Sequence, residues 1–407
     1  MLSKGFEIEV YTGTPTGEIV GLSDRIVADL NGFITEPDSR NVEYTTAPSY
    51  RYERSLVDLL QPRMNLRDYL KPDGYTLIPG STLPLSGSDK FCRSDPGNPY
   101  HTYIEQTYGT KVVTASVHIN IGVSDPEVLM RLCRLVRVEA PLYLALSASS
   151  PFLNGQLTGS HSTRWSVFPK TPTHVPLFES HSHFIQWTEE QLRLGTMQNV
   201  RHLWSAVRPN GDRRPYILNR LELRICDLIS NPVHLLAITA LLEARLIQAI
   251  NDPDIDPLVM SHLPLDRRNT DLVVMADENE LLAAQSSLDS TLTHWQTGQP
   301  IVARDWIQSL YEEVWSTAKK EGFSCFLLPL QHILRDGNEA IRWIQQCESG
   351  MTPPEVVRSA IQEMMTQETS LEGRCVSKGI HKSGLQINVG CKIVDAFFIH
   401  LIFSSSI

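Results

Sequence analysis

The chain has 407 residues, of which 42% are hydrophobic and 20% are charged, and its formal net charge is −10 at pH 7. This composition supplies a hydrophobic core large enough for one large domain or for two to three ordinary ones. The negative charge argues against nucleic acid and against an anionic membrane surface as partners. A small anionic substrate is still compatible with it, because such a substrate needs only a local basic patch.

The sequence further predicts a cytoplasmic protein without a membrane span. We find no run of 18 apolar residues and, at the start of the chain, none of the basic and apolar regions of a signal peptide. The cysteines are scattered without a CxxC pair, which is typical of reduced thiols rather than of a disulfide or zinc framework. They are Cys92, Cys133, Cys226, Cys325, Cys347, Cys375 and Cys391.

The first 125 residues are rich in predicted strands and turns. Residues 6–10 read FEIEV, and this alternation of apolar and acidic residues predicts a strand with Glu7 and Glu9 on one face. Residues 41–45 read NVEYT and place Glu43 in a similar pattern. Turn signals separate these segments, at Gly13, Gly17, Gly32, Pro37-Asp38, Gly74 and Pro79-Gly80.

A further strand is predicted over residues 114–122, with Ser116, His118 and Asn120 on one face. Polar residues on one strand face most often simply meet solvent. Here the other strand-like segments carry acids on one face, which favours a functional role for His118. It could ligate a metal ion or donate to a phosphate.

Helices follow in the second part of the chain. Asp125-Pro126-Glu127 and Asn231-Pro232 are start signals for two long helices, each with apolar residues at helical spacing. A polar, turn-rich insert at 147–182 lies between them. The predicted helices span about 128–146, 232–250, 278–292, 303–320, 337–347 and 354–368. The sequence therefore predicts an α+β fold with its strands mainly in the N-terminal part.

Between the two long helices, residues 220–224 read RLELR and place Glu222 on one strand face with Arg220 and Arg224. Arginine forks suit carboxylates and phosphates. For a single arginine a surface ion pair is the simpler interpretation, but Arg224 shares its strand face with Glu222, which favours a functional role. Further arginines occur at Arg164, Arg208, Arg213 and Arg214.

Carboxylates gathered on the inner face of a sheet repel one another and lose hydration, so they need a proton or a cation. Mg²⁺ is the usual cation, because it prefers oxygen ligands. The four glutamates therefore predict metal-assisted chemistry on a phosphate or a carboxylate. The sequence has no GxxxxGK[ST] loop, no GxGxxG after a strand and no HExxH, which excludes the familiar glycine-loop nucleotide sites and disfavours a helix-borne zinc hydrolase.

Six segments, taken in order, resemble the glutamate–cysteine ligase family of the carboxylate–amine ligase type, in its cyanobacterial form. They read FEIEV, NVEYTTAP, SVHINIGV, HSTRWSVFP, WSAVRP and LELRICD, and the resemblance covers roughly residues 5–370. It implies a glutamine-synthetase-like fold, which is a curved, mainly antiparallel sheet flanked by helices. It also implies a single catalytic domain at 1–373, followed by an atypical tail at 374–407.

The implied reaction joins the γ-carboxylate of glutamate to the amine of cysteine through a γ-glutamyl phosphate, with ATP and Mg²⁺. Its product is γ-glutamylcysteine, the first intermediate of glutathione synthesis. By the same resemblance, Glu7, Glu9, Glu43 and Glu222 would bind Mg²⁺. His118 and Asn120 would contact the metal or nucleotide, and Arg224 would hold the phosphoryl group or a substrate carboxylate. Arg164 and Arg208 are weaker candidates for binding the same anions.

The identity of the acceptor amine rests on the overall resemblance, because members of the wider family activate glutamate for other amines. A ligase that uses a different amine is therefore the alternative within this class. A non-catalytic protein that binds nucleotide or glutamate is the alternative from another class, although every acidic position of the proposed site is present. A metal-dependent hydrolase would reveal itself by its independence of ATP. The oligomeric state is left open.

Overall fold

The structure is a computed structural model that describes residues 1–377, with side chains up to Glu372. Most of the predicted tail, residues 378–407, lies outside the described residues. The division into a catalytic domain at 1–373 and a tail at 374–407 therefore stays a prediction.

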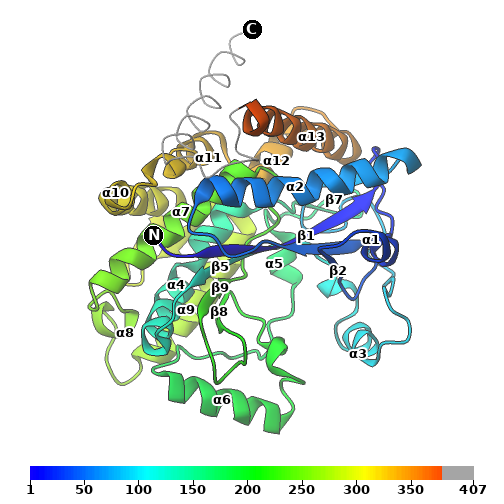
Figure 1. Cartoon of the computed structure of the whole chain (residues 1–407). Coiled ribbons are helices and arrows are strands. Elements are labelled where there is room, and N and C mark those ends of the chain that lie inside the picture. Colours follow the sequence, from blue (N-terminus) through cyan, green and yellow to red (C-terminus); the bar gives the residue numbers. More distant parts are fainter. Residues whose placement is uncertain (378–407) are drawn as a thin grey trace.

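A seven-stranded sheet forms the centre of the molecule (Figure 1). Its strands follow the order β2-β3-β1-β5-β9-β8, β4 pairs with β1, and every pairing is antiparallel. The strands are β1 (Lys4–Gly13), β2 (Phe33–Thr35), β3 (Asn41–Thr45), β4 (Thr76–Ile78), β5 (Val117–Gly122), β8 (Val207–Asn210) and β9 (Arg220–Leu223). Two small hairpins lie apart from it, formed by β6 (Phe152–Leu153) with β7 (Gln156–Leu157) and by β10 (Thr291–Thr293) with β11 (Pro300–Val302).

Helices flank this sheet, and Figure 1 shows α2 lying along β1 with α13 beyond it. The α-helices are α1 (Ser23–Asp29), α2 (Tyr52–Leu70), α3 (Pro99–Tyr108), α4 (Pro126–Ser147), α5 (Thr163–Val167), α6 (His181–Leu194), α7 (Pro232–Asn251), α8 (Pro257–Met260), α9 (Arg268–Ser286), α10 (Ala303–Glu321), α11 (Leu330–Asp336), α12 (Glu339–Glu348) and α13 (Pro353–Ser377). Short 3-10 helices occur at Lys71–Asp73, Gly109–Val112, Val200–His202, Ser287–Asp289 and Ser324–Leu327. The antiparallel sheet with flanking helices confirms the predicted fold class.

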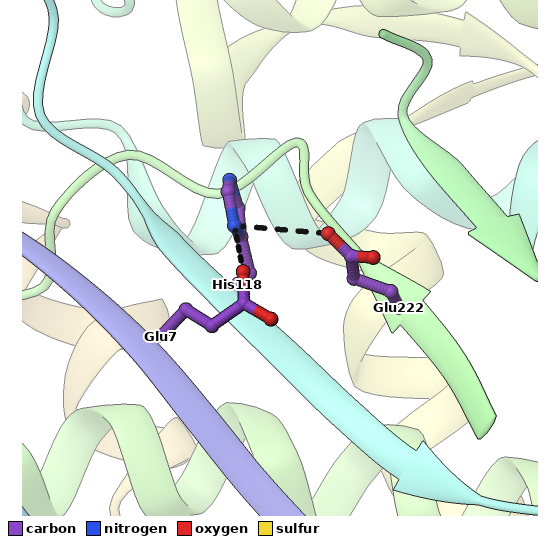
Figure 2. Close-up of side chains that lie close together, drawn as sticks. All are labelled: Glu7, His118 and Glu222. Atoms are coloured by element: carbon purple, nitrogen blue, oxygen red, sulfur yellow. Dashed lines mark hydrogen bonds and ion pairs between the residues drawn. The ribbon is translucent and has the colours of Figure 1, made fainter. Parts of the chain in front are cut away.

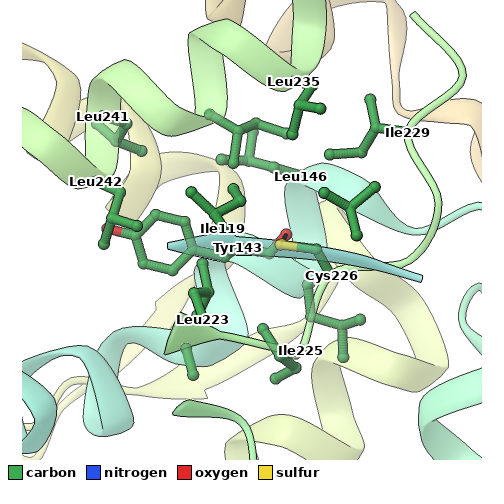
Figure 3. Close-up of a cluster of buried hydrophobic side chains, with 14 of the residues drawn as sticks. Ile119, Tyr143, Leu146, Leu223, Ile225, Cys226, Ile229, Leu235, Leu241 and Leu242 are labelled. Atoms are coloured by element: carbon green, nitrogen blue, oxygen red, sulfur yellow. Dashed lines mark hydrogen bonds between the residues drawn. The ribbon is translucent and has the colours of Figure 1, made fainter. Parts of the chain in front are cut away.

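The apolar side chains of the strands form one face of the sheet, which packs against α4 and α7. Figure 3 shows Ile119 of β5 and Leu223 of β9 beside Tyr143 of α4 and Leu242 of α7, and all four are fully buried. Because side chains alternate between the two faces of a strand, burial of these residues directs their polar neighbours to the opposite face. Packing of the core therefore fixes which side of the sheet carries the acids.

The long helices agree with the predicted ones where the sequence carries a cap. Asp125 accepts hydrogen bonds from the backbone N–H groups of Glu127 and Val128, so α4 begins where expected. Asn231 accepts from the N–H of Val233 at the start of α7. The predictions of α10 and α12 are correct to within two residues.

Other predictions were wrong. The N-terminal region described as strand and loop contains α2, a helix of 19 residues whose apolar spacing is interrupted in the sequence by Pro62. The insert and the residues after it contain α6, which was not predicted. The helix expected at 278–292 is α9, which begins ten residues earlier. Its N-cap is Arg267, which makes no side-chain capping bond, so no start signal marks this end of the helix.

Two expectations drawn from composition can be compared with the structure, and one of them needs correction. By length and composition alone α7 would suffice to cross a membrane, but 83% of that stretch is buried inside the structure, as in a core helix. Four of the cysteines have free thiols, namely Cys92, Cys133, Cys226 and Cys347. Cys325 is disulfide-bonded, so the prediction of reduced thiols is wrong for this residue.

Tyr143 offers a test of how this core is packed. Its side chain is fully buried and its hydroxyl has no hydrogen-bond partner. We expect Tyr143→Phe to leave the free energy of unfolding unchanged or to raise it by about 1 kcal/mol, because an unpaired buried hydroxyl loses its hydration on folding. Urea denaturation measures the difference. A loss of stability of more than about 1 kcal/mol would contradict this description of the core.

Candidate functional site

The register of the sheet brings the polar side chains of four strands together on one face. Glu7 of β1 lies opposite His118 of β5, and Asn120 of β5 lies opposite Glu222 of β9. Farther along β1, Glu9 lies opposite Glu43 of β3. The residues predicted from four separate strand patterns therefore form one continuous site.

Glu7, His118 and Glu222 form the first of two clusters in this site (Figure 2). The imidazole of His118 lies between the two carboxylates, with Nδ1 2.8 Å from Oε2 of Glu7 and 3.8 Å from Oε1 of Glu222. The side chain of Glu222 is completely buried, whereas that of Glu7 is 24% exposed. The cluster is thus open to a ligand on the side of Glu7.

Glu222 is surrounded by hydrogen-bond donors. Arg208 binds both of its oxygens, with Nε 2.8 Å from Oε2 and Nη2 2.9 Å from Oε1. Asn210 donates to Oε2 and Arg224 to Oε1. Burial alone would raise the pKa of Glu222, but the charges of Arg208, Arg224 and His118 outweigh it and hold this pKa well below its usual range. Glu222 is therefore an anion at neutral pH.

Glu7 is stabilised as an anion in a similar way. Burial and the nearby Glu222 would raise its pKa, but the hydrogen bond and charge of His118 and the charge of Arg224 lower it below the usual range. Asn120 donates to Oε1 of Glu7 across 3.2 Å. Asn120 therefore lies inside the site, where its side-chain amide contacts the carboxylate of Glu7.

Glu9, Glu36 and Glu43 form the second cluster, in which the ligand atoms lie within 4.8 Å of one another. Ser116 donates a hydrogen bond of 2.8 Å to Glu9. Burial, followed by the charge of Glu9, raises the pKa of Glu36 to about 8. Burial, followed by the charges of Glu36 and Glu9, raises the pKa of Glu43 to about 11. The carboxyl groups of Glu36 and Glu43 therefore hold protons at neutral pH unless a cation binds in this cluster.

This second cluster fits Mg²⁺. Its donor set consists of carboxylate oxygens, the ligands that a hard divalent cation prefers. Burial and the mutual repulsion of Glu9, Glu36 and Glu43 raise the pKa of Glu36 and of Glu43, and a bound divalent cation would offset both effects. The first cluster differs, because arginines already neutralise Glu222 there.

Glu36 was missed in the sequence analysis. It follows the three-residue strand β2 and precedes Pro37, outside any alternation that would have assigned it to a face. Pairing of β2 with β3 brings it beside Glu43. The one local signal is its position before a proline, which favours an extended backbone but does not indicate a partner.

The predicted arginines are placed differently from one another. The guanidinium of Arg164 donates to the carbonyl oxygens of Ile225 and Arg224 and lies 3.7 Å from Asp227. Through these hydrogen bonds Arg164 holds the backbone of residues 224 and 225, and so helps to position Arg224. Arg208 is bound to Glu222, as described above. Arg224 alone combines a contact with Glu222 and a position 3.4 Å from Nδ1 of His118.

Comparisons with known proteins find relatives of one family. A family model described as Glutamate-cysteine ligase family 2 matches residues 3–368. A protein of Sorangium cellulosum named "Putative glutamate--cysteine ligase 2" is 30% identical over 294 residues, which cover 70% of this chain and 73% of that protein. A protein of Frankia casuarinae named "Putative glutamate--cysteine ligase 2-1" is 28% identical over 338 residues, with 82% and 84% covered.

Two solved structures share the fold. The glutamate–cysteine ligase of Francisella tularensis in complex with AMP has a TM-score of 0.67 at 12% identity, and 98% of each chain is covered. A bifunctional glutathione synthetase from Pasteurella multocida has a TM-score of 0.62 at 15% identity. In that case the match covers 97% of this chain and 52% of the other.

Proposed function

Since the chain belongs to the glutamate–cysteine ligase family 2, we propose that it joins the γ-carboxylate of glutamate to the amine of cysteine, using ATP and Mg²⁺. Membership of the family confirms the resemblance found in the sequence and makes the chain an ATP-dependent carboxylate–amine ligase. The narrower cyanobacterial type stays a prediction. The product, γ-glutamylcysteine, belongs to the proposal.

The observation that carries the proposal is the pairing of acids and arginines on one sheet face. A carboxylate is a poor acyl donor, so its oxygen must first attack the γ-phosphorus of ATP, with ADP leaving. The amine can then attack the acyl carbon of the resulting phosphate, and inorganic phosphate leaves. Both partners of the first step are anions, so a site for this reaction needs concentrated positive charge.

The second acidic cluster would hold the metal. Glu9, Glu36 and Glu43 are the ligands that the structure favours, and Glu7 lies next to them along β1. When bound, Mg²⁺ neutralises the charge of the phosphoryl group during transfer. A glutamate–cysteine ligase of this fold has been solved in complex with AMP, which supports nucleotide binding by this chain.

Two of the basic side chains, Arg224 and His118, would contact the substrates directly. Arg224 is the arginine beside both His118 and Glu222, so its remaining N–H groups are suited to the phosphoryl group or to a substrate carboxylate. His118 donates or accepts at Nδ1 between Glu7 and Arg224. Arg208 and Arg164 position these groups, the first through Glu222 and the second through the backbone of residues 224 and 225.

Product identification by mass spectrometry tests the proposal. Purified protein is incubated with ATP, Mg²⁺ and glutamate, together with a panel of amines that includes cysteine. We expect a product with the mass of γ-glutamylcysteine, formed only when ATP and Mg²⁺ are both present and formed faster than any other adduct.

Other outcomes would be equally informative. A faster reaction with a different amine would retain the chemistry and overturn cysteine as the acceptor. Hydrolysis of a glutamyl bond without ATP would overturn the ligase assignment. A folded protein that binds ATP or glutamate without turning either over would instead indicate a non-catalytic binding protein.

A further inference from the structure

Ser287 has a backbone conformation that serine rarely adopts. It directly follows α9, with φ 43° and ψ −116°, and its side chain is fully buried. These angles lie close to those of the first central position of a type II′ turn, where glycine predominates because it has no Cβ atom. Among the non-glycine residues that the structure describes, the other one with a positive φ is Asn154, on the β6–β7 turn, at 50°. A strained residue persists only where its surroundings hold it, and such residues are concentrated at functional positions.

The hydroxyl group of Ser287 makes two hydrogen bonds that glycine could not make. Nδ2 of Asn338, the N-cap of α12, donates to Oγ across 2.9 Å. The hydroxyl proton is therefore free to bond with Nδ1 of His161, which lies 2.7 Å from Oγ. Burial lowers the pKa of His161, so its imidazole is neutral and Nδ1 can accept this bond. The strained backbone thus directs the hydroxyl toward His161.

His161 lies two residues before α5, the helix that carries Arg164. With five residues, α5 is too short to be stable by itself, so its position depends on its anchors. On one side these anchors are at the end of α9. The backbone N–H of His161 donates to the carbonyl oxygen of Gln285 across 3.1 Å. The N–H of Ser162 donates to that of Ala284 across 2.8 Å. The bond between the serine hydroxyl and the imidazole adds a side-chain anchor at the same place.

On its other side α5 holds the segment that follows β9. Nη1 and Nη2 of Arg164 donate to the carbonyl oxygens of Ile225 and Arg224, each across 3.1 Å. The hydroxyl of Ser162 donates to Oδ1 of the buried Asp227 across 2.8 Å. A displacement of α5 would therefore move the backbone that presents Arg224 to the site.

We propose that Ser287 and His161 are positioning residues for the transfer of the phosphoryl group. Through α5 and Arg164 they fix the backbone of Arg224, which contacts the first cluster and stabilises the charge that develops during transfer. A misplacement of about 1 Å can slow a reaction about 100-fold, so even a smaller displacement of α5 affects the rate. The inference rests on the function proposed above.

Ser287→Gly tests this inference, with Asn154→Gly as the matched control. Both replace a residue of positive φ by glycine, but only the first removes the bond to His161. We expect Ser287→Gly to lower kcat on the order of 10-fold, with KM for glutamate and for ATP changed by less than about threefold. Its melting temperature should stay within about 3 °C of the wild type, because relief of strain offsets the lost hydrogen bonds. Asn154→Gly should have the kcat of the wild type.

Variants of His161 show whether the two residues act through their shared contact. His161→Leu should lower kcat as much as Ser287→Gly does. The double variant should be no slower than either single one, because the same contact is lost in all three. His161→Asn should recover kcat to within about threefold of the wild type, since the side-chain amide places a hydrogen-bonding atom near the position of Nδ1.

The outcomes separate positioning from a purely structural role. A wild-type kcat in Ser287→Gly would overturn the inference, as would a raised KM with unchanged kcat. So would a loss of kcat that follows a lowered melting temperature and is equal in His161→Leu and His161→Asn. If Ser287→Gly fails to fold, equal kcat values in these two His161 variants would overturn it. Each of these results requires an active wild type and leaves the proposed function intact, whereas a wild type that does not ligate glutamate would overturn both.

Discussion

Replacing Glu43 with glutamine is expected to reduce ligation on the order of 1,000-fold without destabilising the metal-free protein. A ligand to a catalytic cation contributes several kcal/mol to the transition state, and each 1.36 kcal/mol corresponds to about tenfold in rate. Glu43 is buried among carboxylates, and its pKa of about 11 means that it is protonated at neutral pH when no cation is bound. Glutamine imitates that neutral form, so the fold should tolerate the change.

Thermal melting with and without Mg²⁺ separates this explanation from a structural one. A cation that binds only the folded state adds about 2.7 kcal/mol at a concentration 100-fold above its Kd. We expect Mg²⁺ to raise the melting temperature of the wild type but not that of Glu43→Gln. Glu18→Gln is the matched control, because Glu18 is exposed in the loop after β1. Unchanged stabilisation of Glu43→Gln by Mg²⁺ would show that the cation binds elsewhere.

The sequence predicted those parts of the site that depend on a local period. Alternation along a strand is set by the backbone, so Glu7, Glu9 and Glu222 could be assigned to polar faces without knowledge of their partners. The structure brings these residues to one side of one sheet, as Glu7 opposite His118 and Asn120 opposite Glu222 illustrate. The long helices with Asp125 and Asn231 as caps were predictable for the same reason.

Contacts between segments that are distant in the sequence could not be predicted from it. Glu36 joins Glu43 because β2 pairs with β3, and no local pattern indicates that pairing. Arg208 and Arg164 read as similar candidates in the sequence, yet one binds a carboxylate and the other binds backbone carbonyls. Such differences depend on which partners the fold brings close, and they decide whether an arginine supports the site or contacts a ligand.

The second large effect is expected at Glu222, where alanine should abolish ligation and destabilise the fold by about 3–5 kcal/mol. Removing one partner of a buried ion pair leaves the other charge without compensation, and this cost exceeds the value of the pair itself. Here two guanidiniums, those of Arg208 and Arg224, would lose their carboxylate. Urea denaturation gives the change in stability. Glu190→Ala, which removes an exposed partner of Arg193, should change little.

A double variant and a pH series distinguish charge from packing. Adding Arg208→Met to Glu222→Leu should recover part of the stability lost in Glu222→Leu alone, because one stranded charge is then removed. The lowered pKa of Glu222 means that its contribution is complete above the ordinary carboxyl value of 4.5 and is lost as the pH falls below it. The stability difference between wild type and Glu222→Ala should thus stay constant from neutral pH to about pH 5 and shrink in stronger acid. A difference independent of pH throughout would indicate that packing, rather than charge, makes Glu222 necessary.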